Sequence, residues 1–314
     1  MNMFSKKKEE QMEESNGSIL QIKKRTNVLL NSILMILSFI SILPFIFVIV
    51  ISFTDEDSLS SNGYRLFPEK WSTDAYEYLL RTGEQLLKSY GVTITITVFG
   101  TIIVLAFIST YAYAISRKSF EYKGFFTKFA FIPMLFNGGM VSTYLVMVRM
   151  LGMKNSLLAL ILPLAMNTWY MMILRTFFKT SVPESIIESA KIDGASELKT
   201  FIRIVLPISL PGMATIALFL TLGYWNDWFN AMLYIDKESL IPLQYLLIRI
   251  ETSMEFLVDN ASKLGTASVE AAAEMPSKTA KMAMVVLATA PIIMAYPFFQ
   301  KYFVQGLTVG SIKE

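Results

Sequence analysis

The segment TSVPESIIESAKIDGASELKTFIRIVLPISLPG, residues 180–212, is the longest polar stretch among the apolar runs in the middle of this chain. It predicts two short helices that meet at Asp193-Gly194, because glycine suits a helix end that needs a positive φ. Ser181 and Glu184 have the spacing of a capping box, which predicts that the first helix starts there. The segment therefore reads as a bent helical loop between two apolar helices.

The composition of the whole chain indicates a membrane protein. Of its 314 residues, 54% are hydrophobic, and the mean hydropathy is +0.48, which is too apolar for a soluble domain of this length. The chain has no cysteine and no histidine. Disulfides, thiolate nucleophiles and histidine proton relays are thereby excluded, as are metal sites built from cysteine and histidine.

Six nearly uncharged runs are long enough to cross the hydrocarbon core of a bilayer. Backbone groups in lipid have no water to pair with, so each run is expected to be a helix. We expect kinks where proline interrupts a run, at Pro44, Pro133 and Pro163. The runs cover about residues 28–53, 91–116, 129–148, 156–174, 212–234 and 282–300.

The distribution of lysine and arginine predicts the orientation in the membrane. With the N-terminus inside, the cytoplasmic segments hold 17 of the 28 basic residues, whereas the outer segments hold 11 basic and 14 acidic residues. This places the polar loop 180–212 in the cytoplasm, together with both termini. Residues 1–26 then form a polar cytoplasmic tail, and residues 27–314 form the membrane domain.

Two outer segments are too long to be simple turns. Residues 54–90 begin with an acidic cluster, and residues 235–280 include a predicted Ala/Glu-rich helix near residues 268–275. Each is large enough to form a surface. Two interpretations stay open for them: a docking face for an external protein, or packing on the membrane helices alone.

The polar loop resembles the EAA loop of ABC importer permeases. That motif has Glu-Ala-Ala, a glycine six residues after the glutamate, and Ile-x-Leu-Pro after nine more residues. Here the residues are Glu188-Ser189-Ala190, Gly194 and Ile204-Val205-Leu206-Pro207, with serine for alanine as the one departure. The resemblance implies a cytoplasmic coupling helix that docks on an ATPase subunit. Its contact residues would be Glu188, Ser189, Ala190, Asp193, Gly194 and Ala195.

Three further stretches resemble the carbohydrate-uptake branch of these permeases, which is related to the smaller maltose-type permease. They are FNGGMVSTY at residues 136–144, GYWNDWF at residues 223–229 and YPFFQKYFVQG at residues 296–306. The first is similar to the subgroup for complex oligosaccharides of the aldouronate type. Together with the loop, the resemblance covers nearly all of residues 27–314.

The resemblance implies an all-α integral membrane protein with six transmembrane helices and the type I ABC importer permease fold. It also implies partners: a second permease in a heterodimer, two cytoplasmic ATPase subunits, an external sugar-binding protein, and a carbohydrate, with no role for nucleic acid. The chain would be a multi-pass protein of a bacterial cell membrane. It would hold no metal or cofactor itself, since ATP and magnesium would bind the partner ATPase.

One predicted span contains a concentration of polar and aromatic side chains. Asp227 is the one acidic residue inside a predicted span, and a charge there needs water, a partner or a substrate. Tyr224, Asn226 and Trp228 surround it, and amides, carboxylates and flat aromatic faces are the groups that bind sugars. We therefore expect these residues, with Asn167, to line a substrate pathway. The open alternatives are an interfacial position for Asp227 and helix packing for Asn167.

Two other functions are weighed against transport driven by a partner ATPase. The chain has no G-x-x-x-x-G-K-[ST] sequence, so it is not itself a P-loop ATPase and is not expected to be an enzyme. A stand-alone ion-coupled secondary transporter or channel would need membrane charges, and only Asp227 is available. A membrane-embedded enzyme would need paired carboxylates in the membrane, and the spans contain no such pair.

Overall fold

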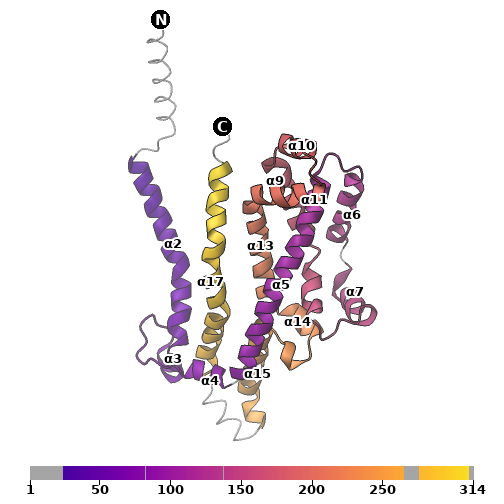
Figure 1. The fold of residues 1–314 in the computed structure, drawn as a ribbon. Helices are drawn as coiled ribbons and strands as arrows, with labels where there is room; N and C mark the ends of the chain where they lie inside the picture. The colour runs from indigo at the N-terminus through magenta and orange to yellow at the C-terminus, as the bar shows by residue number, and fades with distance from the viewer. Residues whose placement is uncertain (1–23, 82, 137, 265–275, 311–314) are drawn as a thin grey trace.

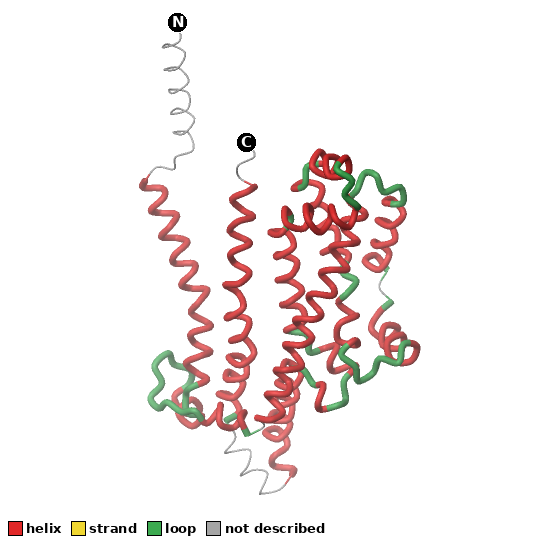
Figure 2. The backbone as a smooth tube through the Cα atoms, viewed as in Figure 1, coloured by secondary structure: helices red, strands yellow, loops and turns green. Residues whose placement is uncertain are grey.

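The computed structural model describes residues 24–81, 83–136, 138–264 and 276–310. Within these ranges the chain is helical, and extended pairing is limited to one bridge between Thr54 and Trp71. Figure 2 shows the helices joined by short loops. The predicted all-α fold is confirmed. The predictions for the start of the N-terminal tail and for a helix at residues 268–275 fall outside the described residues.

Three helices in the described ranges are individually long and apolar enough to span a membrane. They are α2 (Lys24–Ser52), α5 (Gly83–Ser116) and the part Ser277–Gln300 of α17 (Ser277–Gly310). They match the first, second and sixth predicted runs. The other runs are bent pairs, and the chain has up to six spans if each pair counts as one.

The bent pairs are assembled from shorter helices. The first consists of α6 (Lys123–Leu135) and α7 (Gly139–Leu145), which continues as the π-helical turn Val146–Met150. The second consists of α8 (Leu158–Ile161), the 3-10 turn Leu162–Leu164 and α9 (Thr168–Ser181), with a bend of 57°. In the third, Glu197–Ile208 meets α13 (Leu210–Trp225) at 83°.

Glycine and proline explain two of these breaks. Gly139 begins α7 with a φ of +82°, a conformation that favours glycine, at the break between α6 and α7. Pro163 lies in the 3-10 turn between α8 and α9, where a bend was predicted. Pro44 and Pro133 lie inside α2 and α6, which continue through them, and the kinks predicted there stay predictions.

The prediction of one helix over residues 212–234 is wrong. α13 ends at Trp225, and a separate helix, α14, covers Phe229–Tyr234. The cause is Asp227, whose carboxylate accepts hydrogen bonds from the backbone and side-chain amides of Asn230 at 3.1 and 2.7 Å. A short polar side chain that binds nearby backbone N–H groups competes with helix continuation. Asp227 therefore lies in a break between helices and not within a continuous span.

α5 is the central helix of the bundle and packs against α9 and α13 (Figure 1). Tyr224 of α13 is only 1% exposed, and its hydroxyl donates to the carbonyl of Ile161 in α8 at 2.9 Å. Its ring covers Gly100 of α5, where a Cβ atom would lie 2.8 Å from Tyr224 Cζ. This one side chain therefore sets the spacing of three helices.

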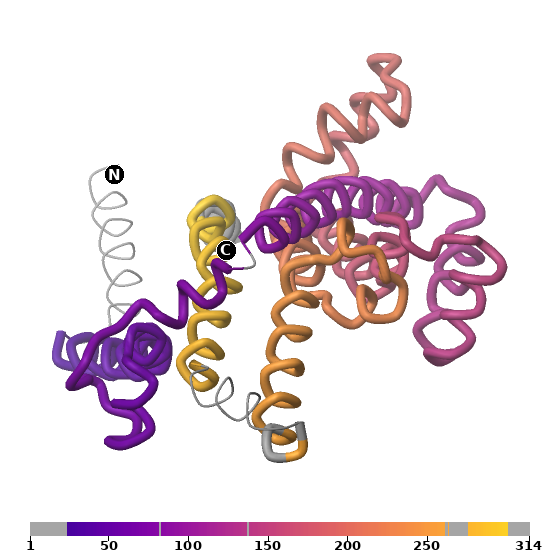
Figure 3. The backbone as a smooth tube through the Cα atoms, turned by 90° about the horizontal axis from the view of Figure 1, so that it is seen from below, coloured from indigo at the N-terminus to yellow at the C-terminus, as the bar shows by residue number. Residues whose placement is uncertain are grey.

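α2 and α17 lie at one edge of the molecule. Viewed from below, α17 lies between α2 and the rest of the bundle (Figure 3). Hydrogen bonds from Tyr90 to the Leu287 carbonyl and from Trp225 to the Ala288 carbonyl hold α17 against α5 and α13. α2 packs mainly on α17, and most of its apolar side chains are exposed.

The helical bundle has two different ends. α10 (Glu184–Ile192) lies at one end, together with the start of α2 and the end of α17 (Figure 1). α3 (Glu56–Asn62), α4 (Asp74–Leu80) and α15 (Leu243–Leu264) lie at the opposite end. There the Glu56 carboxylate accepts hydrogen bonds from the backbone amides of Lys278 and Thr279, which joins α3 to the start of α17.

Candidate coupling loop and translocation site

The loop at residues 180–212 contains two helices, as predicted. α10 ends at Ile192, and α11 (Glu197–Thr200) continues into the π-helical turn Phe201–Val205 and the short α12 (Leu206–Ile208). Between α10 and α11, Gly194 has a φ of +76°. Its N–H binds the carbonyl of Lys191 at 3.0 Å, and the N–H of Ala195 binds the carbonyl of Ala190 at 2.9 Å. These two bonds define a Schellman motif, so the glycine-dependent helix end is confirmed.

The predicted capping box at Ser181 and Glu184 is wrong. α9 extends through Ser181, and α10 begins at Glu184 directly after Pro183, without a side-chain cap. The Glu184 carboxylate instead forms an ion pair with the guanidinium of Arg117. Arg117 is only 6% exposed, and a buried guanidinium needs a counter-charge far more than an exposed helix end needs a cap.

The end of α5 holds both helices of the loop. Arg117, directly after α5, binds Glu184 at the start of α10. One turn earlier, the Tyr113 hydroxyl donates to Glu197 Oε2 of α11 at 2.7 Å. Glu197 Oε1 forms an ion pair with Lys191 Nζ at the end of α10, at a distance of 2.6 Å. We call these five residues the α5 clamp.

Aromatic packing supports the α5 clamp from below. The Tyr113 ring lies 4.8 Å from the ring of Phe201, and both pack near Phe178 of α9. Phe178 and Phe201 are buried, so the contact is part of the hydrophobic core. The loop, α5 and α9 therefore meet in one closely packed group of aromatic rings.

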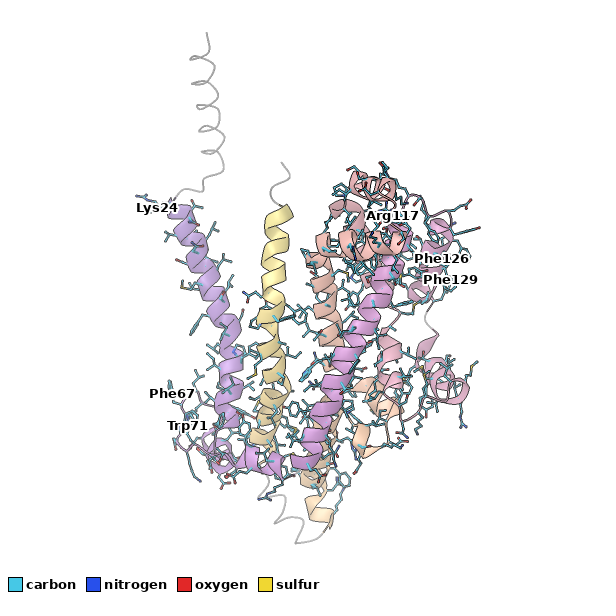
Figure 4. All side chains as sticks on the ribbon, viewed as in Figure 1. Lys24, Phe67, Trp71, Arg117, Phe126 and Phe129 are labelled. Carbon is cyan, nitrogen blue, oxygen red and sulfur yellow. The ribbon has the colours of Figure 1, made fainter. Side chains whose placement is uncertain are left out.

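Sequence reasoning did not identify Tyr113 and Arg117. Both lie more than 60 residues before their partners, so no local spacing connects them to the loop. The one available signal is an arginine immediately after a long apolar run. Figure 4 places Arg117 at the end of the molecule where the loop lies.

α10 has an inner and an outer face. Ile187, at 1% exposure, and Ala190 are buried against the rest of the chain. Glu188 and Ser189 are exposed on the outer face, and Ile192 at the helix end is 86% exposed. The outer face of α10 therefore presents a carboxylate, a hydroxyl and an apolar side chain.

The residues expected to contact an ATPase therefore fall into two groups. Glu188, Ser189, Asp193 and Gly194 are exposed, and Ala195 is half-buried. Ala190 instead packs within its own chain. Ile192 and Leu198, which the sequence did not single out, add exposed apolar area to the same surface.

The predicted pathway residues also separate by environment. Asn226 is exposed, Asp227 half-buried and Trp228 partly exposed, all at the break between α13 and α14. Asn226 accepts from the Gln244 amide at 3.4 Å. Tyr224 is a core side chain, and Asn167 caps α9 by accepting from the Tyr170 N–H at 3.1 Å. The structure thus brings three of the five together.

A groove of about 520 Å³ lies at the end of the bundle opposite the loop. It runs between α4 and α15, so the two long segments at residues 54–90 and 235–280 both contribute to it. Arg81, Arg249 and Glu238 are its charged lining residues, and Leu246, Met254 and Leu257 are among its apolar ones. This end of the bundle therefore has a concave surface with both charged and apolar side chains.

Comparison with known proteins supports the same type of molecule. Residues 17–309 match the family model described as "Binding-protein-dependent transport system inner membrane component". Protein LplC of Bacillus subtilis is 40% identical over 274 residues, 87% of this chain and 90% of that protein. The polygalacturonan/rhamnogalacturonan transport system permease protein YtcP of the same organism is 39% identical, over 91% of this chain and 98% of YtcP.

A solved structure has the same fold. A chain of a bacterial ABC transporter involved in the import of the acidic polysaccharide alginate superposes with a TM-score of 0.71 and 27% sequence identity. The match covers 90% of this chain and 98% of that one. With the family match over most of the sequence, the protein belongs to the binding-protein-dependent transport system inner membrane components, the permease subunits of ABC importers.

Proposed function

We propose that this chain is the permease subunit of an ATP-driven importer that carries an oligosaccharide into the cytoplasm. The support for the substrate class comes from similar proteins: YtcP is named for polygalacturonan and rhamnogalacturonan, and the structural relative imports alginate. The exposed polar and aromatic groups at Asn226, Asp227 and Trp228 are consistent with a saccharide ligand.

The proposed assembly contains a second permease, two ATPase subunits and an external sugar-binding protein. ATP and magnesium bind the ATPases and not this chain. The protein lies in a bacterial cell membrane, with both termini and the loop 180–212 in the cytoplasm. The shared position of α10, the start of α2 and the end of α17 supports this arrangement, and the groove at the opposite end offers a surface for the binding protein.

The α5 clamp is the observation that carries the proposed mechanism. An ATPase that holds the exposed face of α10 would displace the whole loop, since Gly194 fixes the angle between α10 and α11. The ion pair of Arg117 with Glu184 and the hydrogen bond of Tyr113 to Glu197 pass that displacement to α5. Because α5 packs on α9 and α13, the break at Asp227 would move with it.

In the proposed pathway, the break at Asn226, Asp227 and Trp228 contacts the sugar. Tyr224 positions this break through its contacts with Gly100 and Ile161. Asn167 lies at the start of α9, where its oxygen caps the helix, and in this proposal its side-chain amide nitrogen contributes to the pathway. The arrangement allows hydrogen bonding and ring stacking without covalent chemistry, which fits transport.

Reconstitution tests this function. The chain, purified with its co-purifying subunits from native membranes, is placed in vesicles with the binding protein, and uptake of labelled oligogalacturonate, alginate oligomers and maltotriose is measured. We expect uptake of at least one oligosaccharide that requires both ATP and the binding protein. Uptake driven by an ion gradient without ATP, by this chain alone, would support a stand-alone secondary transporter instead.

A further inference from the structure

A second cavity, of about 390 Å³, lies beside the coupling loop between the end of α5, the start of α6 and the end of α9. Arg117, Lys118, Lys123 and Lys179 line it, and Glu184 is the one acidic residue in its lining. Glu184 is already paired with Arg117. Among the described residues, no carboxylate lies within ion-pair distance of the three lysine ammonium groups. We call this cavity the basic pocket.

The basic pocket concentrates positive charge. Arg175 and Lys123 both repel the ammonium of Lys179, and Lys123 Nζ is held near Lys118 by a 3.0 Å hydrogen bond to its carbonyl. The Nε–H of Arg117 is buried and has no hydrogen-bond partner in the part of the chain that the structure describes. Within the described part of the chain, three lysine charges without carboxylate partners in one cavity, next to a buried arginine with an unpartnered N–H, favour a bound anion.

The surroundings of the basic pocket indicate where the anion comes from. Tyr122, Phe125 and Phe129 are exposed at the start and along the side of α6, next to Lys123 and Lys128. Figure 4 shows Phe126 and Phe129 on α6 at the same end as Arg117. An exposed tyrosine beside lysines at the end of an apolar helix is characteristic of the level of the lipid headgroups, and the phenylalanines continue from it along the helix.

We propose that the basic pocket binds a phosphate group, supplied by the headgroup of an anionic phospholipid. The lysines would act as point charges toward the phosphate oxygens, in the way that basic pockets between membrane helices hold lipid headgroups. The bound phosphate would lie next to the Arg117–Glu184 pair. Lipid composition would then influence the α5 clamp. This proposal rests on the proposed orientation, with the loop on the cytoplasmic side.

Lipid binding is tested on the full-length chain in detergent by native mass spectrometry. Phosphatidylglycerol and phosphatidylcholine are titrated in separate arms, and inorganic phosphate in a third. The pocket variant is Lys118→Gln/Lys179→Gln. The control variant, Lys24→Gln/Lys199→Gln, removes the same charge at the same end of the molecule but outside the pocket, at the start of α2 and in α11.

We expect phosphatidylglycerol to bind the pocket variant about thirtyfold more weakly than the original chain, since each surface lysine contributes a severalfold effect. The control variant should change little, and phosphatidylcholine should bind all forms weakly. Equal losses in both variants, or no loss in the pocket variant, would overturn the proposal. Phosphate binding that depends on the pocket, without a lipid effect, would keep the site but assign it to a soluble ligand.

Two further measurements separate a loss of lipid binding from a loss of folding, and the lipid-binding assay itself does not depend on transport. Thermal unfolding of each variant shows whether the chain stays folded, and the single variant Lys179→Gln provides a milder change with a proportionally smaller loss of affinity. Lipid binding is read without uptake. A failed uptake assay would therefore contradict the proposed transport function and leave the pocket result intact.

Discussion

At the residue scale, Gly194 controls the bend of the coupling loop. Its φ of +76° strains any residue with a Cβ atom, although the space around the position is open. A residue with a Cβ atom at this φ costs about 1–2 kcal/mol. Gly194→Val should destabilise this helix end by at least that amount, because a β-branched side chain fits the left-handed region especially poorly. We expect the variant to remain folded in the membrane and to hydrolyse ATP with little uptake, as measured by the ratio of transported sugar to ATP hydrolysed.

Gly194→Asn is the matched control, because asparagine adopts positive φ more readily than other non-glycine residues. It should retain most of the uptake. If the valine variant transports normally, the bend at Gly194 has no role in coupling. If both variants fail equally, an added side chain at this exposed surface matters more than backbone strain.

The second residue-scale prediction concerns Asp55, whose negative charge stabilises the segment that follows α2. It caps α3 by accepting from the Ser58 N–H at 3.0 Å, and it pairs with Lys70 at 2.7 Å. The hydrogen bond from Lys70 and then that from Ser58 hold the pKa of Asp55 below its ordinary value. Its stabilisation of the outer segment is therefore complete above the ordinary pKa and is lost as the pH falls through the lowered value.

Hydrogen exchange at the amides of α3, corrected for intrinsic rates, checks this between pH about 6 and about 3. Protection should fall at the acid end of the original chain. Asp55→Asn keeps the cap on α3 but loses the ion pair with Lys70. In this variant the α3 amides should be less protected near neutral pH than in the original chain, and their protection should change little with pH. A steep pH dependence in the asparagine variant would assign the effect to another carboxyl group.

At the scale of elements, the α5 clamp connects α5, α10 and α11 through two ion pairs and a hydrogen bond, and the prediction concerns the ion pair of the buried Arg117 with Glu184. Glu184→Gln leaves the Arg117 guanidinium buried without a counter-charge, which should cost roughly 3 kcal/mol of unfolding free energy. Arg117→Met leaves the partly exposed Glu184 unpaired and should cost less. The double variant should lose less unfolding free energy than the two single variants lose together, because neither charge is then left without its partner.

Thermal unfolding in detergent measures these three variants, and the sugar transported per ATP measures coupling. We expect the double variant to regain stability but not coupling, because the rigid link from α10 to α5 is missing. Additive stability losses would show that the ion pair does not act as a unit. Full coupling in the double variant would place the transmission elsewhere.

At the scale of the whole molecule, the two ends of the bundle should face opposite sides of the membrane. The chain has no cysteine, so single-cysteine variants report on one position each. Phe67 (87% exposed) and Ile192 (86% exposed) are on segments at opposite ends. In intact cells, Phe67→Cys should react with a membrane-impermeant maleimide, and Ile192→Cys should react only after the cells are opened.

The cysteine-free original chain is the control and should not react. Labelling of Ile192→Cys in intact cells would invert the proposed orientation and remove the coupling role from the loop. Protection of Ile192→Cys in opened membranes that contain the ATPase, and its loss when the ATPase is stripped, would support docking on α10.

The sequence by itself determined the all-α membrane fold, the two-helix loop at residues 180–212 and the glycine at its bend. These features depend on local chemistry: apolar length, helix breakers and a residue that tolerates positive φ. The position of the loop relative to the long outer segments also followed, because crossing a bilayer fixes which segments share a side.

Only the tertiary structure decided how Glu184, Asp227 and Tyr224 are used. Glu184 pairs with Arg117, 67 positions earlier, in place of capping its own helix. Asp227 lies between two helices and accepts hydrogen bonds from Asn230 at the start of the second, while Tyr224 packs on Gly100 in the core. Each outcome depends on which buried charge, free amide or small residue the fold brings beside the side chain. Sequence spacing contains no record of those neighbours, because packing joins residues far apart along the chain.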